Sequence, residues 1–141
     1  MAEITVRAAP EQIDAVMDFV NQQLDALSCP EEARVDLDVA VDELLSNIIR
    51  YAYGPGTGTV TVRVETREEP MTVILTFVDR GVPFEPLAEE RPDTTSLPTR
   101  ERPRGGLGLY LVRSLVDEIA YARRDGRNEL TIRKKTEQGG T

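Results

Sequence analysis

The feature that most constrains this fold is the order of its predicted helices and strands. The spacing of apolar residues distinguishes the two. Apolar residues recur at helical spacing in three segments, at about residues 10–27, 30–53 and 106–116. Alternating or continuously apolar runs, which are typical of strands, occupy residues 4–8, 60–64, 71–78, 119–123 and 130–134. The order β-α-α-β-β-loop-α-β-β predicts an α+β fold: a two-layer sandwich in which helices cover one face of a mixed, mostly antiparallel sheet.

The length predicts one domain. With 141 residues, 40% of them hydrophobic and 30% charged, the chain can form a single core with a polar surface. Residues 71–78 are nearly continuously apolar, so we expect the central strand there. The segment 80–104 holds five prolines and lacks periodicity, which indicates a long loop. We expect the domain to span residues 1–135 and a flexible tail to occupy residues 136–141.

Composition excludes several classes of function. A net charge of −8 argues against direct nucleic-acid binding, which needs a basic surface. The charge suits a basic protein partner or a metal-nucleotide, and it fits equally well with a role in solubility alone. The chain has no histidine, so it cannot form a Ser-His-Asp triad or activate its one cysteine, Cys29, with an imidazole. It shows no signal peptide and no apolar run of membrane-spanning length. We therefore expect a cytoplasmic protein that does not contact a membrane.

The second helical segment carries a polar face beside its apolar face. At about 100° per residue, Glu43, Asn47 and Arg50 fall within about 60° of one another. A carboxylate there could accept a proton from an attacking oxygen, and an amide oxygen could bind a hard cation such as Mg²⁺. The same spacing also fits a solvated helix face on which Glu43 and Arg50 pair.

Two further motifs suit a nucleotide site. Asp79 ends the apolar strand and is followed closely by Gly81, so its carboxylate could accept a hydrogen bond from an exocyclic amine, or it could simply start a turn. Glycines 105, 106 and 108 lie where a loop becomes a helix, a position that attracts phosphate, although they would also permit tight packing. In that helix we expect the core to take Leu107, Tyr110, Leu111, Leu115 and Val116.

These motifs, in this order, resemble a known family. Glu43-x-x-x-Asn47, Asp79-x-Gly81 and Gly106-x-Gly108 are similar to the ATP site shared by DNA gyrase, heat-shock chaperones, histidine kinases and mismatch-repair ATPases. The longer runs 41–47, 79–84 and 105–112 resemble the bacterial anti-sigma factor serine/threonine protein kinases, and the resemblance covers about residues 3–135. It implies a histidine-kinase-like ATPase fold that binds Mg-ATP, sequesters a sigma factor and phosphorylates an anti-sigma-factor antagonist.

The resemblance also implies roles for single residues. Glu43 would be the general base, Asn47 the Mg²⁺ ligand, Asp79 the adenine acceptor, and residues 85–104 the ATP lid. The ATP-binding set it implies is Asn47, Arg50, Asp79, Gly81, Phe84, Arg104, Gly105, Gly106, Leu107, Gly108 and Leu109. The chain departs from the family in having Tyr51 where relatives often have histidine, and in lacking a clear counterpart, near Asn128, of the last-strand threonine that helps to hold adenine.

Two alternatives remain open. The chain could be a nucleotide-gated binding module that sequesters a regulator without transferring phosphate, or a detached histidine-kinase ATPase domain whose receiving histidine lies on another protein. An intact Glu43 favours the kinase over the module. The family resemblance also implies a homodimer, to which the alternating residues 4–8 could contribute at a sheet edge.

Overall fold

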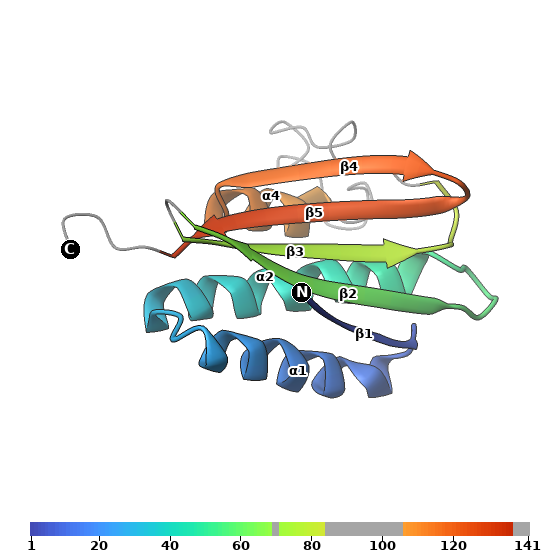
Figure 1. The fold of residues 1–141 in the computed structure, drawn as a ribbon. Coiled ribbons are helices and arrows are strands. Elements are labelled where there is room, and N and C mark those ends of the chain that lie inside the picture. Colours follow the sequence, from blue (N-terminus) through green and yellow to red (C-terminus); the bar gives the residue numbers. More distant parts are fainter. Residues whose placement is uncertain (69–70, 84–105, 137–141) are drawn as a thin grey trace.

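A computed structural model describes residues 1–68, 71–83 and 106–136. Its five strands form one sheet in the order β1-β2-β3-β5-β4 (Figure 1). Their bounds are β1 Ala2–Arg7, β2 Thr59–Arg67, β3 Thr72–Asp79, β4 Glu118–Arg124 and β5 Arg127–Lys135. Each neighbouring pair among these strands is antiparallel. The α+β prediction is confirmed, and the apolar run 71–78 does supply the central strand, β3.

The described helices pack together on one side of the sheet (Figure 1). A short 3-10 turn at Pro10–Gln12 leads into α1, Ile13–Ala26, and α2 spans Glu31–Tyr51. The third described helix, α4, spans Gly106–Leu115. None of the described helices is long and apolar enough to cross a membrane.

The core forms where the apolar stripes of α1 and α2 meet the inner face of the sheet. Apolar side chains at helical spacing are fully buried on both helices, and those at alternate strand positions are buried against them. The buried set includes Val16, Val20, Leu24, Leu37, Val41, Leu44, Val60, Val62, Leu75, Phe77 and Ile132. Each such side chain contributes about 1.5–3 kcal/mol relative to exposure, so this layer fixes how α2 lies against β3 and β5.

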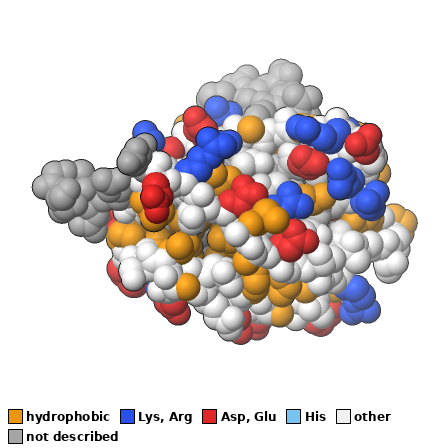
Figure 2. Space-filling view, viewed as in Figure 1, with side chains coloured by type: hydrophobic (Ala, Val, Ile, Leu, Met, Phe, Trp, Pro, Cys, Tyr) orange, Lys and Arg blue, Asp and Glu red, His pale blue; other side chains and the backbone are white. Residues whose placement is uncertain are grey.

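The outer face of the sheet carries polar side chains beside the apolar Ile74 and Val78 of β3. Threonine hydroxyls of neighbouring strands lie within hydrogen-bonding distance there, Thr5 to Thr61 at 2.8 Å and Thr76 to Thr131 at 3.4 Å. Figure 2 shows acidic and basic side chains interspersed on the face of the molecule in view. An ion pair also joins β5 to β4, with Nε of Arg133 and Oε2 of Glu118 3.4 Å apart. Because the side chains of Arg133 and Glu118 are exposed, their ion pair contributes little to stability.

Helix α4 packs through a narrower face than the sequence predicts. Leu109 and Val112 are buried, but Tyr110 and Leu111 are 48% and 41% exposed, so the expectation that both belong to the core is wrong. The reason is geometric: when Leu109 and Val112 face α2, the two residues between them point away from it. The side chain of Leu107 lies outside the described residues, and Leu115 and Val116 are half-buried.

The end of α4 is joined to α2 and β5 by one lysine. Lys134 of β5 donates from Nζ to Oδ2 of Asp36 on α2 at 2.9 Å and to the carbonyl oxygen of Leu115 at 2.7 Å. A cation at a helix C-terminus also interacts favourably with the helix dipole. Lys134 therefore fixes the end of the helix that begins with the glycine motif.

Candidate nucleotide site

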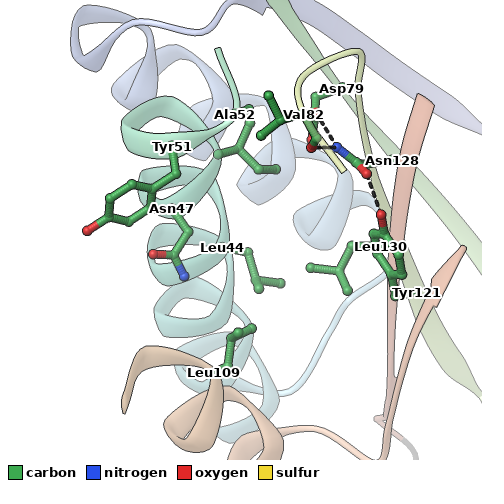
Figure 3. Close-up of a pocket in the computed structure, with 11 residues that line it drawn as sticks. Leu44, Asn47, Tyr51, Ala52, Asp79, Val82, Leu109, Tyr121, Asn128 and Leu130 are labelled. Carbon is green, nitrogen blue, oxygen red and sulfur yellow. Dashed lines mark hydrogen bonds between the residues drawn. The ribbon is translucent and has the colours of Figure 1, made fainter. Parts of the chain in front are cut away.

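A pocket opens between α2 and the inner face of the sheet, with α4 closing one end (Figure 3). Its walls are mostly aliphatic, with polar groups of Asp79, Tyr121 and Asn128 at the strand side and of Asn47 and Tyr51 on α2. The lining residues are Leu44, Asn47, Ile48, Tyr51, Ala52, Asp79, Val82, Leu109, Tyr121, Asn128 and Leu130. An apolar pocket with a few convergent polar groups is the usual form of a small-molecule site.

Asp79 lies at the strand side of this pocket and is only 5% exposed. It is the last residue of β3 and pairs in register with Asn128 of β5. One oxygen, Oδ1, accepts hydrogen bonds from the backbone N–H of Gly81 at 2.8 Å and from Nδ2 of Asn128 at 2.9 Å. No described residue donates to the other oxygen, Oδ2.

Asn128 is the centre of a hydrogen-bond network that sequence reasoning missed. Besides Asp79, its Nδ2 donates to the carbonyl oxygen of Val82 at 2.8 Å. Its Oδ1 accepts from the hydroxyl of Tyr121 and from Nη1 of Arg123, the latter at 3.2 Å. Figure 3 shows Asp79, Asn128 and Tyr121 linked in this way along one side of the pocket. The pairing of β5 with β3 sets Asn128 opposite Asp79, and no local sequence pattern predicts that long-range register.

The turn after β3 is held from two sides. The N–H of Val82 donates to the carbonyl oxygen of Ala52, just beyond the end of α2, at 2.8 Å. On the other side, Nη1 of Arg123 donates to the carbonyl oxygen of Gly81 at 2.8 Å. The backbone beside the Asp79 carboxylate is therefore fixed by both α2 and β4.

Residues of the polar α2 face lie in different surroundings. Asn47 lines the pocket, and its Nδ2 is buried without a hydrogen-bond partner among the described residues. Glu43, one turn earlier, is half-buried, does not line the pocket, and has no hydrogen bond or ion pair with a described residue. Arg50 is exposed, with its guanidinium carbon 5.8 Å from the ring centroid of Tyr51, so it does not pair with Glu43.

The glycine motif is described in part. Gly106, Leu107 and Gly108 form the first turn of α4, and Leu109 reaches the pocket from the same turn. The backbone N–H groups of such a turn have no partner within the helix and can bind an anion. Phe84, Gly105 and the predicted lid 85–104, including Arg104, lie outside the described residues, as does the predicted tail from residue 137.

The side chains near the pocket offer few ligands for Mg²⁺. The described residues contain no group of three or more Asp, Glu, Cys or His side chains placed to hold a metal ion. Mg²⁺ in nucleotide sites is commonly held by one or two protein ligands together with phosphate oxygens, so a full protein cage is not required. Asn47 fits that arrangement because its buried amide lacks a partner for Nδ2 and is free to turn its oxygen toward an ion.

Cys29 is not part of this site. It lies in the α1–α2 connection, where burial raises the pKa of its thiol above the ordinary value of 9.0. Such a thiol stays protonated at neutral pH, which agrees with the exclusion of thiolate chemistry.

The fold and the pocket together define an ATPase-type nucleotide-binding domain. The chain belongs to the histidine kinase-like ATPase family, whose model matches residues 6–134. More particularly, its homologues are bacterial serine-protein kinases named BtrW and RsbW. The predicted resemblance is thus confirmed.

Three comparisons define that relationship. The chain is 32% identical to the serine/threonine-protein kinase BtrW of Bordetella bronchiseptica over 70% of this chain and 68% of the relative. It is 31% identical to the serine-protein kinase RsbW of Halalkalibacterium halodurans over 83% of this chain and 72% of the relative. The match to RsbW of Bacillus cereus, at 30% identity, spans 64% of this chain and only 58% of the relative.

A solved structure has the same fold. The crystal structure of the RsbU and RsbW domains of Rv1364c from Mycobacterium tuberculosis superposes with a TM-score of 0.61 at 15% identity. The match covers 96% of this chain and 32% of that longer chain.

Proposed function

We propose that this protein is an anti-sigma regulatory serine/threonine protein kinase. In this proposal it binds Mg-ATP in the pocket between α2 and the sheet, sequesters a sigma factor, and transfers the γ-phosphoryl group to a serine or threonine of an anti-sigma-factor antagonist. The similarity to BtrW and RsbW kinases supports the reaction class. The partners follow from the family resemblance of the motifs.

The burial and hydrogen bonding of the Asp79 carboxylate are the main support for nucleotide binding. Its carboxylate is buried at one side of an apolar pocket, is fixed through Oδ1, and has no donor to Oδ2 among the described residues. Because Asp79 lines the pocket, Oδ2 is the oxygen left to accept a hydrogen bond from a ligand. The exocyclic amine of adenine supplies a donor, while the aliphatic walls suit the faces of the purine ring.

The residues of α2 would act at the phosphate end. The substrate hydroxyl oxygen bonds to the γ-phosphorus, the bond from that phosphorus to the bridging oxygen breaks, and ADP leaves with the electron pair. The hydroxyl proton goes to the carboxylate of Glu43, which no described residue engages. Asn47 would hold Mg²⁺, whose charge stabilises the phosphate oxygens in the transition state.

The proposal also covers the location of the protein in the cell and its oligomeric state. We assign the protein to the cytoplasm, where sigma factors act, and expect it to form a homodimer, with the edge strand β1 a candidate contact. Among the described strands, β1 pairs only with β2 and so has one open hydrogen-bonding edge, which supports that choice. Light scattering that finds only monomer at all micromolar concentrations would contradict the dimer.

The test is phosphoryl transfer to a defined partner. Partners are first captured with and without ATP, and candidate antagonists are then incubated with the protein and γ-labelled ATP. Acid-stable label on serine or threonine is the expected result. ATP binding without transfer to a verified antagonist would favour the nucleotide-gated binding module. Acid-labile label on a partner's histidine would favour a detached histidine-kinase ATPase domain.

A further inference from the structure

We infer that Asn128, held by Tyr121 and Arg123, is a positioning residue that fixes the Asp79 carboxylate and thereby makes the pocket selective for 6-amino purines over 6-oxo purines. This inference rests on the nucleotide-binding part of the proposed function. The family resemblance assigns no role to Asn128, so the case for it depends on the contacts that follow.

The Asn128 side chain is fully engaged by protein atoms. Both hydrogens of Nδ2 have acceptors, Oδ1 of Asp79 at 2.9 Å and the carbonyl oxygen of Val82 at 2.8 Å. Its Oδ1 has two donors, the hydroxyl of Tyr121 and Nη1 of Arg123. Carboxylate and carbonyl oxygens can only accept and the guanidinium can only donate, so these partners fix which end of the amide is nitrogen. Asn128 therefore has no hydrogen left for a nucleotide and acts through Asp79.

Holding Oδ1 decides where Oδ2 lies. A carboxylate turns readily about its Cβ–Cγ bond, which has broad torsional preferences. With Gly81 N–H and Asn128 Nδ2 both bound to Oδ1, Oδ2 is the oxygen left for a ligand. An ionised carboxylate oxygen attracts an amine donor and repels a carbonyl oxygen. The selectivity between adenine and hypoxanthine or guanine thus depends on this orientation.

Arg123 supports this network by binding both Asn128 and the backbone at Gly81. Its Nη1 contacts both Asn128 Oδ1 and the Gly81 carbonyl oxygen, at 3.2 and 2.8 Å, from the edge strand β4. Tyr121 approaches the same amide from β4, two residues earlier, and lines the pocket as well. Two residues of one strand therefore hold the Asn128 oxygen so that its nitrogen faces Asp79.

The experiment measures ATP and ITP affinity by calorimetry for the full chain and its variants. ITP carries an oxygen at the purine position where ATP carries the amine. Wild type should prefer ATP, Asn128→Ala should reduce the ATP/ITP preference by about tenfold, and Tyr121→Phe by about threefold. Asn128→Thr, which restores one donor, should recover part of the preference lost in Asn128→Ala. Thr131→Ala, on the same strand but on the outer face, is the matched control and should change neither affinity.

The ratio separates positioning from a merely structural role. If Asn128 only supports the Val82 turn, ATP and ITP affinities will fall together and the ratio will stay at the wild-type value, which would overturn the inference. If Asn128→Ala does not fold, Tyr121→Phe, which keeps the ring, decides the question by the same ratio. Wild type that binds neither nucleotide would overturn the proposed function, and this inference with it.

Discussion

Gly81 lies so close to Ala52 that no side chain fits between them: a Cβ on Gly81 would lie 2.1 Å from the Ala52 carbonyl oxygen. The same oxygen accepts the Val82 N–H at 2.8 Å. The glycine of the Asp79-x-Gly81 motif is thus required by packing against the end of α2, independently of any nucleotide.

Gly81→Ala should therefore destabilise the protein and weaken ATP binding together. Overpacking against backbone costs about 1–3 kcal/mol, because the turn must move away from α2. Thermal unfolding and calorimetry on the same sample would measure both effects. Gly54→Ala is the control: Gly54 has a φ of +56° but nothing within 4 Å of a Cβ, so it reports backbone strain alone. A Gly81→Ala variant as stable as wild type would contradict the clash.

Asp79→Asn should keep the fold and lose the nucleotide. The new amide can still accept from Gly81 and Asn128 through its oxygen, which leaves its NH₂ group facing the adenine amine. We expect ATP affinity to fall by about 1.5–3 kcal/mol, the scale of a hydrogen bond to a charged group. Calorimetry that gives wild-type affinity in a folded variant would remove the adenine assignment.

Asn47→Ala tests the metal ligand. If the Asn47 oxygen binds Mg²⁺, its loss should weaken binding of Mg-ATP far more than binding of ATP in the presence of a chelator. Titrations with and without Mg²⁺ make the comparison within one variant. Equal losses under both conditions would instead indicate that the Asn47 amide contributes only to the pocket wall.

Lys134→Met tests the connection between α4, α2 and β5. The Lys134 and Asp36 side chains are 18% and 29% exposed, so removing the ammonium leaves a partly buried carboxylate and the Leu115 carbonyl without their donor. The expected loss is about 2 kcal/mol of unfolding free energy by urea titration. Lys135→Met is the matched control, since Lys135 is exposed, and should change stability by less than about 0.5 kcal/mol. Equal stabilities of the two variants would contradict the role of Lys134.

The sequence was sufficient for the elements whose hydrophobic period is local. The run 71–78 predicts a buried strand because both of its faces are apolar, and β3 lies at the centre of the sheet. The stripe of Leu37, Val41 and Leu44 likewise predicts which side of α2 is buried. These patterns depend on neighbours a few residues away, so they can be interpreted without knowing the tertiary contacts.

Asn128 could not be placed in this way. The predicted strands at 119–123 and 130–134 leave Asn128 between them, but Asp125 and Gly126, with φ of +53° and +75°, complete the turn and β5 begins at Arg127. The reason for a polar residue inside that strand is Asp79, a partner 49 residues earlier in the chain. Tyr110 and Leu111 show the converse: they are apolar, and only the orientation of α4 against α2 determines that they are exposed.

Glu43→Ala separates the kinase from a binding module. If this carboxylate accepts the hydroxyl proton during transfer, its removal should leave ATP affinity nearly unchanged and slow the chemical step by about 10² to 10⁴. Some residual rate is expected, because a loose phosphoryl-transfer transition state is stabilised mainly by Mg²⁺ and other positive charge.

The measurement is single-turnover transfer from labelled ATP to the antagonist at saturating Mg²⁺, with nucleotide affinity determined in parallel. Asp42→Asn is the matched control: Asp42 is the neighbouring carboxylate on α2 and is exposed, so its loss should leave the transfer rate unchanged. A wild-type rate in Glu43→Ala would rule out the general base. An equal slowing in both variants would show that the rate follows the charge of α2 rather than a proton acceptor at residue 43.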